Sequence, residues 1–516
     1  MPEPLSADPV PTSREPRDSF TIGASGGDEV VVPWPVVARL RRRVRRAMSG
    51  QTERAGHRWW VLWTVLAGLF SVNVTFTIFA VALNDVGRAL HTSLADVTWV
   101  ITAPLLSFGI AAPVMGKVGD TWGHRRLYLA GTSAAVVFAL LTAVAPNVGS
   151  LIAVRALSGI DGAAAGAASM ALIFRVFSEE DRVKAMGWWS LVGAGGPVIG
   201  VVVGGVLIQT FGWRALFVAQ APITFAALLA AAAVLPETER EADRRPFDWQ
   251  GAATLTVAVT AFLFGLNRGP VLGWASPAVV ASGVIFPVMA AAFVAAERRA
   301  AAPLVPLSFL RRRNFAMPIA NQFFSNFAYM GGFILAPVLL ERVFHFSDAH
   351  AGVTVIARPL AFSVTAPVAG YLAGRIGDRV SVVAGSLVLG ASMLLFAAVG
   401  VGSSTLLVLA ALALSGVGLG ISSPSAAAAV ANSVEEDSLG VASASQQLMA
   451  QVGVVAGIQV LQTIQTSRQG AGLIGSFHDA YLVGALGCLL AAACAAGMLG
   501  RLASARPPAA AGAPSH

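Results

Sequence analysis

Residues 116–126 read GKVGDTWGHRR, a short charged stretch between two long apolar runs. A related stretch follows 254 positions later, where Ala112-Pro113-Val114-Met115-Gly116 recurs as Ala366-Pro367-Val368-Ala369-Gly370, and Gly123 and Arg125 recur as Gly377 and Arg379. A helix, a tight basic loop and another helix are therefore predicted twice. Such a repeat indicates a duplicated bundle of membrane helices.

The composition is that of a membrane protein. Of the 516 residues, 56% are hydrophobic and only 12% are charged, and the mean hydropathy of +0.70 is too apolar for a surface that meets water. The net charge of +8 does not indicate nucleic-acid binding, because the basic residues lie in loops between apolar runs and not on one face of a soluble fold. We expect no nucleic-acid partner.

Fourteen apolar runs are long enough to cross a bilayer core, which takes roughly 20 helical residues. They predict an all-α membrane protein with one six-helix repeat over residues 59–235, a linker with two inserted transmembrane helices over 236–314, and a second six-helix repeat over 315–500. Spans 7 and 8 are assigned to the insertion because the repeated loop lies between spans 2 and 3 and again between spans 10 and 11. The predicted spans are residues 59–83, 96–115, 126–146, 150–174, 185–208, 213–235, 249–267, 277–296, 315–340, 350–373, 380–400, 404–425, 440–463 and 479–500.

The distribution of basic residues predicts the orientation, because Lys and Arg next to short loops stay in the cytoplasm. With the N-terminus inside, 28 of the 35 Lys and Arg residues face the cytoplasm and five lie outside. The other two, Arg155 and Arg358, fall within predicted spans. Both termini are therefore expected to be cytoplasmic.

The tails and the metal-binding residue types add little. Residues 1–58 are predicted to form a disordered basic tail without a cleavable signal peptide, and residues 501–516 a second cytoplasmic tail. The arginine-rich run at 39–46 is either solvated or in contact with anionic membrane lipid. Cys488 and Cys494 point to different faces of one helix, and the seven histidines lie in tails, loops or span ends, so we expect no disulfide, metal or cofactor.

The charged loop resembles the loop pattern of the major facilitator superfamily, Gly-x-x-x-Asp-Arg-x-Gly-Arg-Arg. Over about residues 59–500 the chain is similar, within that superfamily, to the fourteen-span drug:proton antiporters of the EmrB/QacA type. Two arginines of the pattern are replaced by Thr121 and His124, and Gly374 stands at the aspartate position of the second repeat. The matching residues are Gly116, Asp120, Gly123, Arg125 and Arg126, and in the second repeat Arg375, Gly377 and Arg379.

The resemblance implies that this loop is a conformational gate. Glycines permit a tight turn with the helices close together, while Asp120 can accept a hydrogen bond from an arginine or sit at a helix N-terminus, stabilising one packing of the two halves. The alternative is that Arg125 and Arg126 act only as cytoplasmic anchors.

The fifth predicted span resembles the antiporter signature Gly-Pro-x-x-Gly-Gly. Aligned on the final glycine pair, the proline position holds Val201, and Pro197 lies one turn earlier. Small residues spaced by four also let another helix approach closely, so ordinary packing explains them as well. The residues concerned are Gly196, Pro197, Gly200, Gly204 and Gly205.

Three ionisable residues are predicted inside the membrane: Arg155 and Asp161 on the fourth span and Arg358 on the tenth. Such a residue costs roughly 2.5–3.5 kcal/mol on insertion scales, so it needs a partner or a task. Arg155 and Asp161 are six residues apart and are not expected to share a helix face. Thr75 stands where the family has an aspartate that takes part in proton coupling, which leaves Asp161 as our candidate for proton binding during transport.

Alternatives remain open for these charges and for the polar amides. Asp161 could instead be a structural partner of Arg358 or of another span, and Arg358 could bind an anionic group on a substrate. The amides are either hydrogen-bonding partners between helices or contacts in a substrate cavity, and Phe323, Phe324 and Phe327 could form an apolar wall. The cavity candidates are Asn73, Thr75, Gln322, Asn326 and Gln447.

These features predict a transporter and not an enzyme, because no nucleophile with its base, phosphate loop or metal cluster occurs at a useful spacing. The resemblance implies an exporter in the bacterial inner membrane that exchanges protons for amphipathic small molecules by alternating access. A dedicated metabolite or lipid exporter of the same fold, or a membrane sensor that does not transport, is the alternative.

Overall fold

A computed structural model describes residues 19–22, 30–33, 56–92, 94–237, 248–300, 303, 306–400, 402–468, 470 and 472–499. Within these ranges some side chains are outside the description, chiefly those of residues 74–84, 94–96 and 200–206. The helices of 20 or more residues are α2 (Gly56–Ala89), α3 (Leu94–Trp122), α4 (His124–Ala143), α5 (Val148–Val176), α6 (Arg182–Phe211), α7 (Trp213–Val234), α8 (Trp249–Leu272), α9 (Pro277–Arg299), α10 (Arg313–Phe344), α12 (Ala357–Ile376), α13 (Asp378–Ala397), α14 (Thr405–Ala431), α15 (Leu439–Ser467) and α16 (Leu473–Ala496).

Shorter elements complete the described chain. The helix α11 (Asp348–Val355) precedes α12, and single turns of 3-10 helix lie at Phe309–Arg311 and Glu436–Ser438. Strands β1 (Ser19–Ile22) and β2 (Val30–Pro33) pair antiparallel, with Ser19 opposite Pro33. This hairpin lies inside the segment predicted to be a disordered tail; residues 56–58 of that tail begin α2, and its remaining residues are outside the description.

Twelve of the helices are long and apolar enough to cross a membrane, which makes the chain a multi-pass membrane protein. A lipid environment explains their form, because every backbone donor and acceptor in the bilayer core must be paired within the segment. α2 and α6 are not among the twelve, and both contain stretches whose side chains are outside the description. Fourteen spans therefore stay a prediction.

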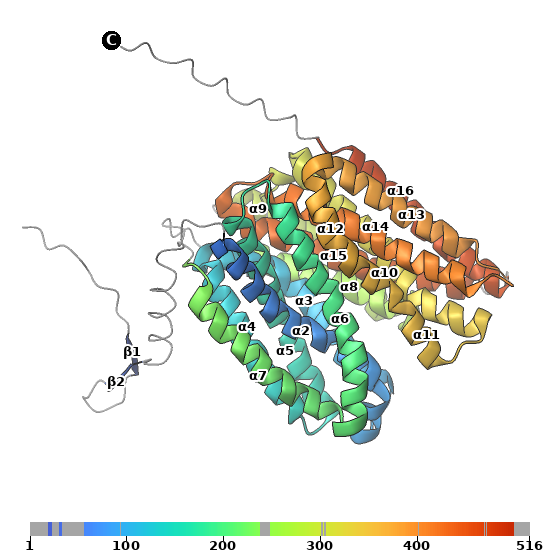
Figure 1. The fold of residues 1–516 in the computed structure, drawn as a ribbon, viewed down its shortest axis with the longest axis horizontal. Helices are drawn as coiled ribbons and strands as arrows, with labels where there is room; N and C mark the ends of the chain where they lie inside the picture. Colours follow the sequence, from blue (N-terminus) through green and yellow to red (C-terminus); the bar gives the residue numbers. More distant parts are fainter. Residues whose placement is uncertain are drawn as a thin grey trace, which may run out of the picture.

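The long helices form two groups in space. The blue-to-green helices α2–α7 lie on one side of the molecule and the gold-to-red helices α10–α16 on the other (Figure 1). α8 packs against α3 of the first group and α15 of the second, and α9 packs against α8. We call residues 56–235 the N-half and residues 313–499 the C-half, and α8 with α9 forms a pair of helices at their junction.

The two repeated loops turn in the same way. Gly123 joins α3 to α4 with a φ of 97°, and Gly377 joins α12 to α13 with a φ of 88°. Side chains rarely adopt this region of backbone space, so a glycine is needed at both positions. The sequence repeat therefore corresponds to a repeated turn.

The tenth predicted span, residues 350–373, is interrupted. α11 ends at Val355 and α12 begins at Ala357, with Ile356 between them. Pro359 lacks a backbone N–H and its ring crowds the carbonyl four residues earlier, which is that of Val355, so a continuous helix is disfavoured here. The break brings Arg358 to the first turn of α12.

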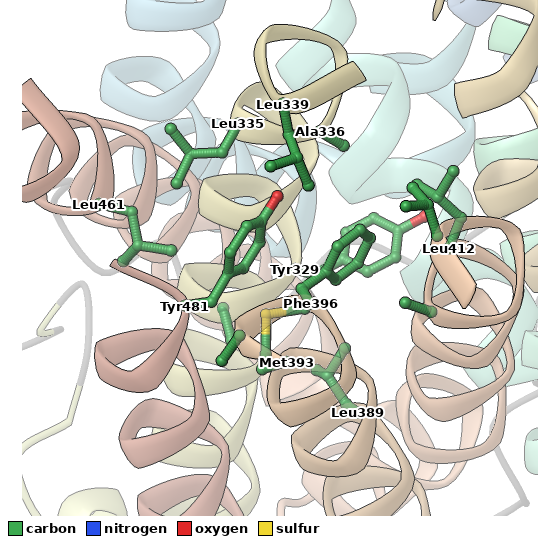
Figure 2. Close-up of a cluster of buried hydrophobic side chains, with 14 of the residues drawn as sticks. Tyr329, Leu335, Ala336, Leu339, Leu389, Met393, Phe396, Leu412, Leu461 and Tyr481 are labelled. Atoms are coloured by element: carbon green, nitrogen blue, oxygen red, sulfur yellow. The ribbon is translucent and has the colours of Figure 1, made fainter. Parts of the chain in front are cut away.

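The largest buried cluster lies within the C-half. Phe396 of α13 stacks on Tyr481 of α16 with their ring centroids 4.7 Å apart, and Met393 and Leu389 lie beside them (Figure 2). Tyr329 of α10 belongs to the same cluster. These contacts between α10, α13, α14 and α16 make the C-half a packed unit, against which the N-half can move as a body.

The halves touch through glycines that occupy matching positions in the two repeats. A Cβ atom at Gly116 of α3 would lie 2.6 Å from the carbonyl oxygen of Gly440 on α15. Its counterpart Gly370 on α12 faces α6, where an added Cβ would lie 2.7 Å from the carbonyl oxygen of Val183. Real Cβ contacts of this kind are not observed, so only glycine permits the helices to approach so closely.

We predict that Gly116→Val destabilises the packing of α3 on α15 by about 1–3 kcal/mol, because the added carbons overlap the backbone of Gly440. The measurement is the thermal denaturation midpoint of the purified protein in detergent. Gly374→Val is the matched control, since no atom lies within 4 Å of a Cβ added there. Equal midpoints for the two variants would show that the contact is not tight.

Candidate substrate cavity and gate

A cavity of about 640 Å³ lies between the N-half and the C-half. Its wall is mostly apolar and comes from α2, α3, α5 and α6 of the first half and α10, α11, α12, α14 and α15 of the second. A volume of this size and character suits an amphipathic small molecule. Because both halves supply the wall, a change in their packing changes access to it.

Three glutamines in the wall have a buried polar atom with no hydrogen-bond partner among the residues that the structure describes. They are the Oε1 atoms of Gln322 and Gln446 and the Nε2 atom of Gln447. A buried polar group costs free energy unless it is paired, so each is a candidate to bind a polar group of a substrate. Asn321 lies outside the cavity lining, and although its Oδ1 also has no partner among the described residues, its Nδ2 donates to Ser386 Oγ at 2.8 Å and to the Ala491 carbonyl at 2.9 Å.

The amide candidates from the sequence thus divide by role. Asn73, Gln322, Asn326 and Gln447 all line the cavity. The Nδ2 atoms of Asn73 and Asn326 each donate to a carbonyl one turn earlier on their own helix, at 2.9 and 2.8 Å. Asn321 joins α10 to α13 and α16, which is the helix-bonding role left open above.

The aromatic wall comes from other residues than the sequence suggested. Phe323, Phe324 and Phe327 are not in the cavity lining, because Gly453 and Gly457 of α15 pack against the backbone of α10 at Phe323 and Phe327. That contact turns this face of α10 toward α15. The aromatic residues of the wall are Phe108, Trp189, Tyr329, Phe333 and Phe362.

One end of the molecule holds the halves together through Asp120, and we call it the gate end. The backbone N–H groups of Gly440 and Val441 donate to the two carboxylate oxygens of Asp120, at 2.9 and 3.0 Å. Both donors belong to the first turn of α15, whose own N-cap residue, Ser438, makes no side-chain cap. Asp120 of the N-half therefore caps a helix of the C-half, where the helix dipole also favours a negative charge.

His124 supports this carboxylate from the same half. Its Nε2 lies 3.0 Å from Asp120 Oδ1, and both side chains are buried. The sequence comparison noted His124 only as a replacement for an arginine. In the structure it holds the aspartate in the orientation that α15 requires.

Further hydrogen bonds join the halves at the same end. Arg182 of α6 donates to Asn432 Oδ1 at 2.7 Å, and Asn432 Nδ2 donates to the Glu179 carbonyl at 3.3 Å. Within the N-half, Arg182 also donates to the Phe174 carbonyl at 2.9 Å. Ser443 Oγ donates to the Ala167 carbonyl at 3.2 Å. The halves are therefore bonded together at the gate end.

An ion-pair group lies beside the gate, outside the spans. Asp181 binds Arg58 Nη1 at 2.7 Å and Lys184 Nζ at 2.6 Å. The hydrogen bond from Lys184 lowers the pKa of the Asp181 carboxyl below its usual value. Since the pKa is lower in the folded protein, this stabilisation is present above the ordinary pKa and is lost as the pH falls through the lowered one.

A second, small cavity of about 20 Å³ lies within the N-half and holds Arg155 and Asp161. This volume accommodates about one water molecule. Asp161 accepts a hydrogen bond from the Gly162 N–H at 2.8 Å, and Arg155 donates to Ser158 Oγ at 3.3 Å and to the Val100 carbonyl at 3.4 Å. The prediction that Arg155 and Asp161 do not share a face concerns their positions around the helix axis, and both side chains nevertheless line this cavity.

The small cavity borders the central one. Val72 of α2 lines both, and Gly162, next to Asp161, lines the central cavity. Asp161 itself is only 5% exposed and is not in the central lining. A change in its protonation would therefore affect the central cavity indirectly, through its neighbours Val72 and Gly162.

Arg358 lies in the C-half and is fully buried. Its guanidinium carbon is 3.8 Å from the centroid of the Tyr329 ring. No ion pair between Arg358 and Asp161 is present in the described structure, so the suggested pairing is not seen. Arg358 also lies outside the cavity lining, although Pro359 and Tyr329 belong to it.

Comparison with known proteins identifies the family. A model of the Major Facilitator Superfamily matches residues 65–458 and, in a second match, 319–514. The chain belongs to the Major Facilitator Superfamily.

Curated members of the superfamily resemble the chain over much of its length. It is 28% identical to the tetracenomycin C resistance and export protein of Streptomyces glaucescens, over 80% of this chain and 77% of that protein. It is 30% identical to the multidrug resistance protein Stp of Mycobacterium tuberculosis, over 64% of this chain and 62% of that protein. The match to Stp thus spans a little under two thirds of its length.

Solved structures show the same fold. The human organic anion transporter MFSD10 superposes with a TM-score of 0.62 at 19% identity, covering 84% of this chain and 99% of that chain. The proton:xylose symporter XylE superposes with a TM-score of 0.62 at 13% identity, covering 84% of this chain and 95% of that chain. The predicted all-α major facilitator fold is confirmed.

Unlike Asp120, the basic residues of the superfamily loop pattern make no hydrogen bond or ion pair with the other half in the described structure. Arg125 donates to the Ala232 carbonyl at the end of α7 at 2.7 Å, which is a contact within the N-half. Arg126, Arg375 and Arg379 are exposed, and the described structure gives them no ion pair. This favours the alternative that the arginines are cytoplasmic anchors. Among the residues of the loop pattern, Asp120 and Gly116 contact the other half in the described structure.

Two predicted groups lie wholly or partly outside the described residues. The side chain of Thr75 is one of them. Of the glycine motif on α6, only Gly196 is described, and it is buried. The remaining members, Pro197, Gly200, Gly204 and Gly205, are outside the description. In the described part of the chain, no group of three His, Cys, Asp or Glu residues could hold a metal ion.

We predict that Asp120→Asn opens the gate end. The amide loses the charge that faces the α15 N-terminus and one of two acceptor positions, and hydrogen bonds to charged groups contribute about 1.5–3 kcal/mol each, so the equilibrium should shift by tenfold or more. The measurement is the alkylation rate of Ser443→Cys in a background of Cys488→Ser and Cys494→Ser, because Ser443 is fully buried between the halves. Arg126→Ala is the control, and an alkylation rate that Asp120→Asn leaves unchanged would contradict the gate.

Proposed function

We propose that this protein is a proton-coupled exporter of amphipathic small molecules in the inner membrane of a bacterium. The observation that carries the proposal is the mostly apolar cavity of about 640 Å³ enclosed by both halves, which are hydrogen-bonded to each other at one end. Rocking of the halves about such a cavity exposes it to the two sides of the membrane in turn. The relatives named as resistance and export proteins support outward transport.

The proposed orientation places the gate end and both termini in the cytoplasm. The excess of basic residues in loops at that end supports this, since such loops are retained inside. Contacts between loops agree with it: Arg58 at the start of α2 binds Asp181 before α6, and Arg312 before α10 binds Glu435 before α15, at 2.9 Å. Each pair is separated by an even number of long helices. The structure would then be the one with its cytoplasmic gate closed.

Broad selectivity follows from the wall of the cavity. Its polar groups are neutral, and aliphatic and aromatic side chains supply most of its surface. Apolar contact depends little on the substrate's detailed chemistry, whereas a site with many fixed hydrogen bonds would reject analogues. We therefore propose antibiotics, dyes or related compounds as substrates, with a dedicated metabolite or lipid as the alternative.

Asp161 is the proposed proton-binding residue. When ionised it attracts Arg155 across the small cavity, and when protonated it does not. Gln220 of α7 also lines that cavity and donates through Nε2 to the Ser71 carbonyl of α2 at 3.2 Å. Proton binding can thus alter how α2, α5 and α7 pack beside the substrate cavity.

The test of the function uses purified protein in liposomes with an imposed pH gradient and a panel of amphipathic dyes. Accumulation of dye on the side from which protons leave, abolished when the gradient is collapsed, is the expected result. Dye movement that is indifferent to the gradient would reject proton coupling. A complete absence of transport across the panel would reject the exporter.

We predict that Asp161→Asn abolishes substrate-driven proton flux in the same liposomes, because the amide cannot take up a proton. Substrate binding, measured by equilibrium dialysis, should change by less than about threefold, since Asp161 lies outside the central lining. Ser150→Ala at the start of the same helix is a control for general damage to α5. Unaltered proton flux in Asp161→Asn would assign coupling to another residue.

A further inference from the structure

Arg358 is the largest fully buried side chain of the described structure. Its guanidinium carbon lies 3.8 Å from the centroid of the Tyr329 ring and 5.5 Å from that of Phe333, both on α10. Tyr481 and Cys488 of α16 are further neutral groups close enough to interact with it. The cation is therefore surrounded by aromatic rings and neutral groups.

No counter-charge accompanies this cation. Within the described residues Arg358 forms no ion pair, and apart from an interaction with the Tyr329 side chain its guanidinium nitrogens have no hydrogen-bond partner. The contact with Tyr329 recovers part of the cost, because an aromatic face attracts a cation. A buried charge with that contact alone is unfavourable, and binding of an anion beside it would lower the free energy.

The position of Arg358 gives an anion a route from the central cavity. Ile356 and Pro359, its neighbours along the chain, line the cavity, and so do Tyr329 and Phe333. The guanidinium thus lies against the ring of Tyr329 and near that of Phe333, two residues of the cavity wall, without belonging to the wall itself. The polar residues of the wall are all uncharged: Asn73, Ser190, Gln322, Asn326, Tyr329, Ser423, Gln446, Gln447 and Gln451.

We propose that Arg358 binds the carboxylate of an amphipathic organic acid, so that organic acids are the preferred substrates of this transporter. The Tyr329 ring turns aside, and the carboxylate takes its place against the guanidinium. This inference rests on the proposed exporter function and specifies the substrate class.

The chemistry favours a carboxylate over other anions. A guanidinium presents two parallel N–H groups that match the two oxygens of a carboxylate. A doubly charged phosphate would bring a second negative charge into a cavity whose described wall holds no second cation. The neutral glutamines and the aromatic side chains remain to receive the uncharged part of the molecule.

The test compares three probes with one apolar body: naphthylacetate, the neutral naphthylethanol and a naphthylethyl-trimethylammonium cation. Their binding to the purified full-length protein is measured by equilibrium dialysis. We expect naphthylacetate to bind at least about tenfold more tightly than the alcohol, and the cation to bind least. Arg358→Gln should lower the affinity for naphthylacetate to that for the alcohol. Arg358→Lys keeps the charge but lacks the two parallel N–H groups, so its affinity for naphthylacetate should be intermediate.

Two further variants separate recognition from folding. Tyr329→Ala removes the ring that covers the guanidinium and should strengthen binding of naphthylacetate but not of the alcohol. Arg214→Gln is the matched control, because Arg214 also lies over an aromatic ring, at 4.4 Å from Trp213, but outside the cavity lining. It should leave the order of the three probes unchanged.

Several outcomes would overturn the inference. One is that the wild type binds the acid and the alcohol with equal affinity. Another is that Arg358→Gln weakens the binding of all three probes equally while Tyr329→Ala does not strengthen the binding of naphthylacetate, which would show that Arg358 has a structural role only. Export of the alcohol from liposomes without preference for the acid would remove the inference and keep the proposed function. Tight binding of the acid without export of any probe would remove the proposed function and keep the site.

Discussion

The packing of the two halves depends on one carboxylate that caps a helix belonging to the other half. Asp120 accepts from the first-turn N–H groups of α15, and His124 holds it from behind. A charge buried at this depth is tolerated because both oxygens are bonded and because a helix N-terminus carries a partial positive charge. The same contact is easily lost as a unit, since separating the halves removes both hydrogen bonds at once. It can therefore act as a latch between two packings.

The latch works only because the helices can come close enough. Gly116 lies one turn before Asp120 on α3, and its lack of a side chain permits α3 to contact α15 at Gly440. With a larger residue there, the carboxylate would stand too far from the α15 N–H groups. Glycine packing and the carboxylate are thus two parts of one interface: the first sets the distance and the second supplies the hydrogen bonds.

Much of this fold could be predicted from the sequence, because lipid imposes a strong pattern. The apolar run predicted at 213–235 is the helix Trp213–Val234, and the turn glycines of both repeats have the expected role. The break before α12 was missed, although Pro359 is a usable signal. The aromatic wall could not be predicted, because the rotation of α10 is fixed by contacts with Gly453 and Gly457, which are distant in sequence. That Arg155 and Asp161 line the same small cavity could not be predicted either, because the angle between two positions on a helix does not include the reach of an arginine side chain.

The two repeats are alike in packing but unlike in charge, and this difference gives the interface a direction. Gly370 on α12 approaches α6 as Gly116 approaches α15, yet the residue that corresponds to Asp120 is Gly374, which has no carboxylate to offer. The α12–α6 contact therefore relies on close packing, whereas the α3–α15 contact adds charge-assisted hydrogen bonds. Packing between smooth glycine faces tolerates sliding and rotation, while the capped helix end holds one geometry. Opening of the gate end should accordingly begin at α3 and α15, with α6 and α12 serving as the surface on which the halves turn.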